Sequence, residues 1–516
     1  MTGILPAGTE YLARLRAQGL QEHARTFDLV LRIAQAVQAA GGRALLVGGC
    51  VRDMLLGRVP KDYDLEVYGL APERLRKLAR RFGTVSEVGV AFGILKLRSP
   101  EGVEIDLSLP RRDSKIGPGH RGFAVRTDPF MRVEDACRRR DFTINAMAAD
   151  PITGELFDPF GGYRDLQARV LRVTDAERFG DDPLRVMRGL QFAARFGLTA
   201  DAESKRVMRA MVPSLRELPK ERFLDEWRKL LLQAPAPSVG LRLGMELGVF
   251  HALYPQFAAL PETPQDPTWH PEGDVWTHTL LTVDQAAAIR DRDQLSDEAA
   301  LVLLLAALCH DLGKPATTAV RDGRITSRGH EAAGVEPADR FLEQIGVDLR
   351  TREKVTRLVA EHTWPRRSYR AETERGERVR DGAIRRLAAR LVPATIAELV
   401  LVAEADHAGR GFFRDAATGR LALPERFPAG EWLRARAAAL DVLHGPPADV
   451  IRGQDLLALG LTPGPAFGAI IRAANRLRDE REFTREQILA HLAGVRDAEQ
   501  ALSRLEALLE RGARQE

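Results

Sequence analysis

A glycine pair followed by two closely spaced aspartates, within residues 44–68 (ALLVGGCVRDMLLGRVPKDYDLEVY), has the composition of a phosphate and metal site. The apolar run before Gly48 and Gly49 predicts a buried strand, and a glycine turn lets an anion approach main-chain N–H groups. Asp62 and Asp64 stand at i and i+2 of an alternating segment, so a strand would point both carboxylates the same way. Paired carboxylates bind Mg²⁺, which holds a triphosphate and activates an attacking hydroxyl. We therefore expect Mg²⁺-dependent nucleotidyl transfer.

Two arginine-rich stretches follow and could bind the phosphates of a nucleotide. Residues 138–147 (RRRDFTINAM) place three arginines together, a repulsion that a purely structural segment avoids and a bound triphosphate would explain. Residues 181–196 (DDPLRVMRGLQFAARF) predict a helix that starts at Pro183 and is capped by an aspartate. A surface helix held by its own ion pairs is the structural alternative. Spacings of three place one acidic and two basic side chains on a single face of this helix, namely Asp182, Arg185 and Arg188.

Taken in order, four motifs resemble those of the class II tRNA nucleotidyltransferases, the CCA-adding enzymes: GGCVRD with KDYD, RRRDFTINAMA, DPFGG and DDPLRVMRGLQFAARFG. The resemblance spans residues 43 to about 232. It implies a polymerase-β-like head followed by a helical neck, body and tail, and hence an α+β fold. It also implies template-independent addition of C, C and A to the 3′ end of tRNA from CTP and ATP.

The same resemblance implies roles for individual residues. Side chains would take the place of a template, because Asp182 and Arg185 would hydrogen-bond the Watson–Crick edge of the incoming base. The implied site residues are Asp62 and Asp64 for Mg²⁺, Gly49 and Arg52 for the phosphates, Arg140 with Asp141 for the triphosphate or ribose, and Asp182, Arg185 and Arg188 for the base.

Two positions depart from the family pattern. Asp181 stands where a glutamate is usual, and Gln191 stands where a third pocket arginine is expected. Because glutamine lacks the charge to anchor its neighbours, we expect Gln191→Arg to raise nucleotide affinity. If addition stalls after CC, the same change is expected to promote addition of A.

Histidines and aspartates recur at the ends of predicted helices in the second half of the chain, as in WHPEGDVWTHTL (269–280) and HDLGK (310–314). Ionisable residues are rare at such buried positions, and imidazole with carboxylate suits a divalent metal. The set resembles the HD phosphohydrolase domain that some bacterial CCA-adding enzymes carry. The metal would be Ni²⁺, Mn²⁺, Co²⁺ or a similar transition ion, or Mg²⁺. The resemblance implies metal ligands at His278, His310, Asp311 and Asp406, with His330 and His362 at a second metal or at phosphate.

Other segments fit a functional and a structural interpretation equally. Glu104 or Asp106, on one face of a predicted strand, could add a third metal carboxylate or form a solvated strand face. Residues 110–123 (PRRDSKIGPGHRGF) predict either a mobile basic loop beside the site or an ordinary surface connection. Lys314 could bind phosphate or cap a helix, and the basic helix at 219–229 could contact RNA or pack within the neck.

The overall composition limits size, compartment and partners. At 516 residues the chain is too long for one core, and 76 Lys and Arg against 72 Asp and Glu permit a polyanionic partner. Three scattered cysteines indicate a reducing compartment, and neither a signal pattern nor an apolar run of membrane-spanning length is evident. We expect a cytoplasmic enzyme that binds tRNA, CTP and ATP, without a membrane or DNA partner.

Composition shifts predict five segments, with a Pro-rich linker at 255–271. The expected segments are a helical N-terminal arm (1–42), the nucleotidyltransferase head (43–175), a helical neck and body (176–260), the HD domain (268–415) and a helical tRNA-binding tail (430–516).

Three alternative functions share part of this pattern. An enzyme that adds only CC or only A would carry the same head motifs. A poly(A) polymerase is less favoured, because no arginine-rich insertion of the GRRF type separates the head motifs. A nucleotide phosphohydrolase with a degenerate head as an RNA sensor is disfavoured by the intact Asp62 and Asp64.

Overall fold

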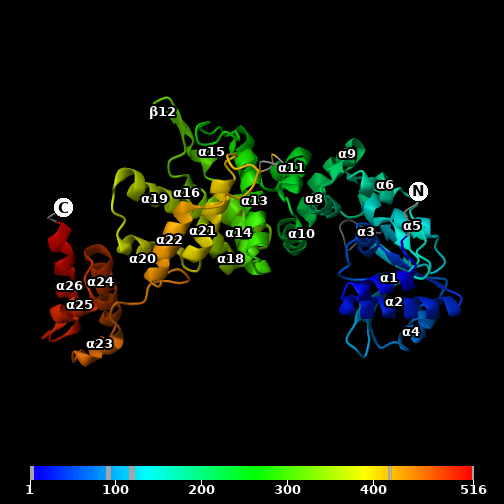
Figure 1. The fold of residues 1–516 in the computed structure, drawn as a ribbon, viewed down its shortest axis with the longest axis horizontal. Helices are drawn as coiled ribbons and strands as arrows, with labels where there is room; N and C mark the ends of the chain where they lie inside the picture. Colours follow the sequence, from blue (N-terminus) through cyan, green and yellow to red (C-terminus); the bar gives the residue numbers. More distant parts are fainter. Residues whose placement is uncertain (1–4, 89–93, 116–122, 416–418, 420, 514–516) are drawn as a thin grey trace. The chain divides into compact units, whose positions relative to one another are not determined.

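The computed structural model describes residues 5–88, 94–115, 123–415, 419 and 421–513, in two compact units, residues 1–254 and 255–516. The first unit is built on a seven-stranded sheet with the order β3-β4-β5-β2-β1-β8-β9 (Figure 1). Neighbouring strands are antiparallel, except that β2 and β5 are parallel. The strands are β1 (Arg43–Val47), β2 (Asp64–Tyr68), β3 (Thr84–Val88), β4 (Ile94–Arg98), β5 (Glu104–Ser108), β8 (Ala148–Ala149) and β9 (Leu156–Phe157).

The N-terminal arm forms two helices, α1 (Gly8–Ala17) and α2 (Gln21–Ala39), that pack against this sheet. The apolar face of α2 buries Phe27 and Val30 in one core with Leu65 of β2. Burial of one apolar stripe is what holds an amphipathic helix on a sheet. The helical packing element expected at the N-terminus is therefore confirmed.

Short helices connect the strands, and a helical region completes the first unit (Figure 1). Glycine at position 48 allows the sharp change of direction from β1 into α3. The helices are α3 (Gly49–Leu55), α4 (Pro72–Ala79), α5 (Val133–Arg138), α6 (Gly162–Gln167), α7 (Ala176–Phe179), α8 (Arg185–Phe196), α9 (Ala202–Met211), α10 (Lys220–Gln233), α11 (Ser238–Leu247) and α12 (Val249–Leu253).

The second unit is helical, with α13 (Val275–Arg292), α14 (Asp297–Cys309), α18 (Leu349–Glu361) and α21 (Ile396–Ala408) packed side by side (Figure 1). The stretch Asp297–Thr317 has the length and composition of a membrane-spanning helix, but 83% of its apolar window is buried inside the protein. Its longer helix, α14, is the central helix of this unit and contacts α13, α18 and α21. The remaining helices are α15 (Lys314–Thr317), α16 (His330–Ala333), α17 (Val335–Gln344), α19 (Trp364–Arg375), α20 (Asp381–Leu391) and α22 (Pro428–Ala439).

The C-terminal helices have a core of their own. Ile451, Leu477 and Leu505 belong to one apolar cluster that includes no residue of the preceding helices. The tail is thus a separately packed helical segment of the second unit. Its helices are α23 (Gly453–Ala458), α24 (Ala466–Arg481), α25 (Arg485–Leu492) and α26 (Ala498–Ala513).

Two segments differ from their predicted forms. The stretch predicted as a basic loop (110–123) contains strand β6 (Arg111–Lys115) and the first residue of its antiparallel partner β7 (Phe123–Thr127), and residues 116–122 lie outside the described residues. The Pro-rich stretch predicted as a linker is packed, because Phe257 and Leu260 are fully buried. Proline limits regular structure but does not prevent short turns from burying apolar side chains.

Candidate active sites

The glycine pair ends β1, begins α3 and makes room for a buried arginine. Gly48 has a φ of +73°, and a Cβ at this position would lie 2.6 Å from Nη1 of Arg140. A side chain at position 48 would therefore displace the guanidinium group. Burial alone would lower the pKa of Arg140, but the charges of Glu66 and Asp64 raise it.

Three carboxylates meet where β2 begins beside β5. Asp64 is the first residue of β2, Asp62 precedes the strand, and Asp106 is the parallel partner of Asp64. The pKa of Asp64 is raised by burial and, in addition, by the charges of Asp106 and Asp62. Oxygen ligands clustered in this way suit Mg²⁺, which relieves their mutual repulsion. Of the two alternatives on β5 it is Asp106 that joins the cluster, whereas Glu104 is 65% exposed beside an arginine.

The three consecutive arginines have different partners. Arg138 forms an ion pair with Glu134 (3.1 Å), whereas Arg139 donates to the buried carboxylate of Glu66 (2.9 Å). Arg139 and Arg140 line the cavity of the head, and Arg138 does not. The expectation that the arginine cluster faces a triphosphate therefore stands for two of its three members.

Arg52 is only 4% exposed, and several neighbours hold its guanidinium group in place. Its Nη1 donates to Oδ1 of Asn145 (2.6 Å), and its Nε and Nη2 donate to Oδ1 of Asp53 (2.9 and 2.8 Å). The ring of Phe196 lies 4.2 Å from the guanidinium carbon. These contacts fix the guanidinium group beside Gly49 and reduce the entropy that it loses on binding an anion.

Asp141 is engaged by the protein itself. Its Oδ2 accepts from Nε of Arg188 (2.7 Å), and its Oδ1 accepts from Nδ2 of Asn145 (3.1 Å). Burial alone would raise the pKa of Asp141, but the charge of Arg188 and these hydrogen bonds lower it. The contacts favour a role in positioning Arg188 over the direct contact with triphosphate or ribose that the resemblance implies.

Asp182 and Arg185 stand at the start of α8, which begins two residues later than the predicted start at Pro183. Oδ2 of Asp182 accepts from Nη2 of Arg222 (2.8 Å), a residue of α10. Arg185 donates to two backbone carbonyls at 2.7 and 2.9 Å, one of them that of Arg139. Both side chains are thus oriented at the cavity by neighbours.

These groups surround one cavity of about 500 Å³ in the first unit. Several lining residues were not predicted as site residues, among them Asn145, Phe192 and Arg222. Asn145 interrupts an apolar segment and Arg222 belongs to the basic helix at 219–229, so both left a signal in the sequence. The lining residues are Gly48, Gly49, Arg52, Asp64, Arg139, Arg140, Asp141, Asn145, Asp182, Leu184, Arg185, Arg188, Phe192 and Arg222.

Gln191 does not line that cavity. The expectation that Gln191→Arg raises nucleotide affinity therefore loses its basis, because the new side chain would not start from the cavity wall. It is 1% exposed, and its Oε1 accepts from Nη1 of Arg195 (2.9 Å). Burial and the nearby charge of Arg52 already lower the pKa of Arg195 to about 10.

A third guanidinium at position 191 would add an uncompensated buried charge. We expect Gln191→Arg to lower the free energy of unfolding by roughly 3 kcal/mol. Gln191→Met is the matched control, since it keeps the length of the side chain without the charge. Denaturant unfolding of the three proteins checks this, and an unchanged or raised stability of Gln191→Arg would contradict it.

Four imidazoles of the second unit share one orientation. Each ring presents Nδ1 to an acceptor and turns Nε2 toward an aspartate. A carbonyl oxygen accepts only from N–H, so three of the rings carry their proton on Nδ1 and leave Nε2 to bind a metal. The Nδ1 contacts are His310 to Ala307 O (2.8 Å), His330 to Ser327 O (2.8 Å), His362 to Val359 O (2.8 Å) and His278 to Glu272 Oε1 (2.7 Å).

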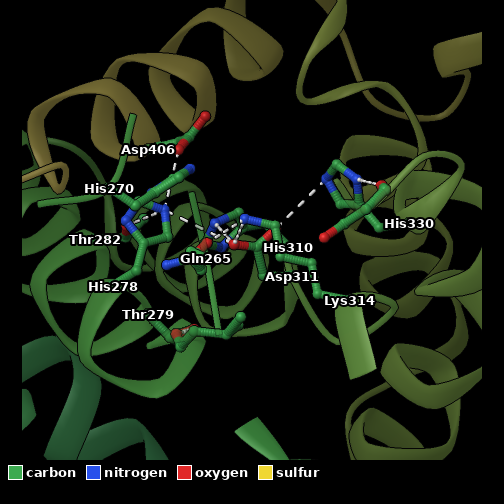
Figure 2. Close-up of polar contacts among 12 residues, drawn as sticks. Gln265, His270, His278, Thr279, Thr282, His310, Asp311, Lys314, His330 and Asp406 are labelled. Atoms are coloured by element: carbon green, nitrogen blue, oxygen red, sulfur yellow. Dashed lines mark hydrogen bonds and ion pairs between the residues drawn. The ribbon is translucent and has the colours of Figure 1, made fainter. Parts of the chain in front are cut away.

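Asp311 lies at the centre of these rings (Figure 2). Its Oδ2 is 3.1 Å from Nε2 of His310 and 3.8 Å from Nε2 of His278. Its Oδ1 is 3.5 Å from Nε2 of His330 and 4.0 Å from Nε2 of His362. One carboxylate therefore faces two groups of imidazoles, an arrangement that can hold two metal ions.

The protonation of the outer rings depends on their partners. Burial alone would lower the pKa of His278, but its contacts with Asp406 (3.1 Å) and Glu272 raise it to about 9. Burial, together with the charges of His310 and His330, lowers the pKa of His362 to about 4. His362 is thus a neutral ring.

The donor atoms around Asp311 fit a divalent metal. Within the described residues, neither oxygen of Asp311 accepts a hydrogen bond and Nε2 of His310 makes none, although Asp311 and His310 are each only 1% exposed. Burial alone would raise the pKa of Asp311, but the charges of His310 and Lys314 hold it well below its usual range. Nζ of Lys314 lies 2.7 Å from Oδ2 of Asp311, so this lysine pairs with the carboxylate. A buried, ionised carboxylate without hydrogen bonds is stable only beside cations.

The cavity above this cluster, about 280 Å³, is lined partly by residues that sequence reasoning missed. Gln265 and His270 come from the stretch predicted as a linker or a helix start, and Gln265 accepts from Nζ of Lys314 (2.6 Å). A pattern of histidines at helix ends does not indicate which arginines line the same cavity. The missed lining residues are Gln265, Asp266, Trp269, His270, Ile325, Ser327, Thr363, Arg366, Arg370 and Arg410.

Three protein families match this chain. Residues 44–172 match the Poly A polymerase head domain, and residues 197–260 match a probable RNA and SrmB-binding site of polymerase A. Residues 275–408 match the HD domain. The histidine cluster thus lies within the HD match, whereas the cavity of the first unit draws its lining from the head match, from the residues that follow it (182–192) and, through Arg222, from the second match.

Solved structures share the fold. The Bacillus stearothermophilus CCA-adding enzyme in complex with CTP is 23% identical, with a TM-score of 0.58 over 90% of this chain and 96% of that one. The Thermotoga maritima CCA-adding enzyme complexed with tRNA is 19% identical, with a TM-score of 0.55 over 94% and 96%. This chain therefore has the fold of the CCA-adding enzymes, a polymerase head followed by helical domains.

Curated relatives share the sequence over most of its length. A multifunctional CCA protein of Xanthomonas campestris pv. campestris is 36% identical over 83% of this chain and 96% of its own. One of Methylococcus capsulatus is 35% identical over 85% and 96%. The chain therefore belongs to the family of multifunctional CCA proteins.

Proposed function

We propose that the first unit adds C, C and A to the 3′ end of tRNA from CTP and ATP, without a template. The observation that carries the proposal is a single cavity lined by several guanidinium groups, by Asp64 of the acidic cluster and by a polar pair at the start of α8. The similarity to multifunctional CCA proteins supports it, as does the fold shared with CCA-adding enzymes that were solved with CTP and with tRNA.

In the proposed reaction the 3′-hydroxyl of the RNA attacks the α-phosphate in line and pyrophosphate leaves. Asp62, Asp64 and Asp106 would hold Mg²⁺, which when bound polarises the phosphate and lowers the pKa of the attacking hydroxyl. Arg52 and Arg140 would neutralise the leaving phosphates. Because Arg52 is already fixed by Asp53 and Asn145, little reorganisation of this group opposes the transition state.

Selection of the base is assigned to Asp182 and Arg185. The carboxylate accepts and the guanidinium donates, which matches the Watson–Crick edges of cytosine and adenine. Uracil and guanine would leave a polar group unpaired in the cavity, at a cost of about 1–3 kcal/mol for each mismatch. Arg222 would hold Asp182 in position until a base replaces this contact.

Arg185→Ala is expected to lose discrimination rather than activity as a whole. The relative kcat/KM for CTP and ATP against UTP and GTP should fall about tenfold or more, because the paired reading of the base edge is removed. Single-nucleotide incorporation with the four triphosphates measures it, with Arg178→Ala, an exposed residue of the preceding helix, as the control. A uniform loss for all four nucleotides would show that α8 does not read the base.

Incubation of tRNA lacking its 3′ end with labelled CTP, ATP or both tests the activity itself. Addition of CC from CTP alone, and of CCA from both, is the expected result. Addition that stops after CC, or that needs a CC end and adds only A, would replace the proposal by a partial activity. Long runs of A would indicate a poly(A) polymerase.

We also propose that the second unit hydrolyses phosphoesters, of the phosphatase or 2′,3′-cyclic phosphodiesterase type. His278, His310, Asp311 and Asp406 would hold one divalent metal, which when bound supplies an activated water. His330 and His362, with the second oxygen of Asp311, would hold another. Mixed imidazole and carboxylate ligands suit Ni²⁺, Mn²⁺ or Co²⁺, with Mg²⁺ as the alternative.

The expected partners and location follow from this chemistry. We infer that tRNA is the macromolecular partner and that the chain acts in the cytoplasm, where its three unpaired, buried cysteines stay reduced. We keep the proposed division into arm (1–42), head (43–175), neck and body (176–260), HD domain (268–415) and tail (430–516). The separate core of the C-terminal helices begins at Ile451, whereas α22 packs against α19 and α21, so this core lies within the proposed tail and does not fix its start at residue 430.

A further inference from the structure

Two arginines line the cavity beside the histidine and aspartate cluster of the second unit. Within the described residues, no carboxylate forms a close ion pair with either of them. Arg366 lies on α19 and Arg410 follows α21, and both line the cavity together with Asp311, His330 and Asp406. They reach the cavity from elements different from those that carry the histidines.

Arg410 is nearly buried and incompletely paired. Its side chain is 12% exposed, and its closest carboxylate is that of Asp406, with Nη2 to Oδ2 at 3.7 Å. Nε of Arg410 is buried and makes no hydrogen bond within the described residues. Asp406 is also a proposed metal ligand, so a bound metal would weaken this single long contact further.

Arg366 is a similar case. Within the part of the chain that the structure describes, no carboxylate lies within 4.0 Å of its guanidinium group. Burial lowers the pKa of Arg366, which shows that its charge is poorly compensated. Arg370, one turn further along the same helix, is different, because it donates to Glu374 at 2.9 Å and stacks on Trp269.

An unpaired guanidinium group beside a metal cluster is costly unless an anion binds there during function. Phosphate, like carboxylate, matches the planar donors of arginine, such charge-assisted pairs are strong, and a phosphate is the anion that a phosphoester brings to a metal site. We infer that Arg366 and Arg410 contact the non-bridging oxygens of the phosphoester that the HD site hydrolyses, an inference that rests on the hydrolase activity proposed above. They bind and orient the phosphate, while the histidine and aspartate residues hold the metal.

Arg366→Met and Arg410→Met test this in the metal-loaded full-length protein. Each is expected to weaken binding of inorganic phosphate, measured by calorimetry, by about tenfold or more. Each should also raise the KM for bis(p-nitrophenyl) phosphate by a similar factor, while the metal content and CTP addition stay unchanged. Arg366→Lys and Arg410→Lys should recover part of the affinity. Arg367→Met, an exposed neighbour on α19 outside the cavity, is the matched control.

The possible results separate the inference from the activity on which it rests. Unchanged phosphate affinity in both methionine variants would overturn the inference, as would a loss of bound metal parallel to the loss of affinity. Arginine-dependent phosphate binding without any hydrolysis by the wild type would overturn the proposed hydrolase activity and support the anion site. Because calorimetry needs no turnover, it decides between these cases.

Discussion

We expect Asp64→Ala to abolish addition of C and A to tRNA and to leave phosphoester hydrolysis intact. This prediction has the largest expected effect. Asp64 begins β2, and the charges of Asp62 and Asp106 raise its pKa. Loss of one of these carboxylates removes a ligand of Mg²⁺ and about 4 kcal/mol of transition-state stabilisation, a thousandfold or more in rate. Asp62→Ala should have the same effect. Incorporation of labelled CTP into tRNA without its 3′ end measures the loss.

Two further variants make this test specific. Asp106→Asn is expected to lower the rate by a smaller factor, because this residue joins the cluster from the neighbouring strand. Glu104→Ala, on the same strand but exposed, should leave addition unchanged. Normal tRNA extension by either alanine variant at position 62 or 64 would show that the metal assignment is wrong.

Removal of His310 and Asp311 together is expected to abolish metal-dependent hydrolysis while addition of CTP and ATP persists. Asp311 faces both groups of imidazoles, and His310 supplies a second ligand from the end of the same buried helix. Without these two residues neither group of proposed metal ligands is complete. We therefore expect the rate of hydrolysis to fall by at least about a thousandfold. Hydrolysis of bis(p-nitrophenyl) phosphate and metal content by mass spectrometry measure the effect.

Loss of fold must be separated from loss of metal in this test. In the double alanine variant Lys314 would remain buried without its carboxylate partner, which lowers stability by itself. His310→Gln with Asp311→Asn keeps the volume of both side chains and should bind no metal. His444→Ala, an exposed histidine of the same unit, is the control. Retained hydrolysis in the volume-preserving variant would mean that the cluster is structural.

Much of the fold and of both sites could be predicted from the residues alone. The strand that carries Asp64, the glycine turn at Gly48 and the apolar helix before His310 all follow from local patterns, because period and turn chemistry are local properties. The resemblance to CCA-adding enzymes added the order of the domains and the roles of residues that no periodicity could assign.

The sequence by itself thus determined which residue types could hold metal and phosphate, since their spacing along strands and helices is a matter of local geometry. Only the tertiary structure decided which of them meet. It joined Asp106 to Asp64, occupied Asp141 with Arg188, and placed Gln191 apart from the cavity. It also placed Arg366 and Arg410, each four residues after a predicted site residue (His362 and Asp406), in the same cavity as Asp311. The physical reason is that contacts between distant segments depend on how buried faces pack, and one sequence does not display that packing.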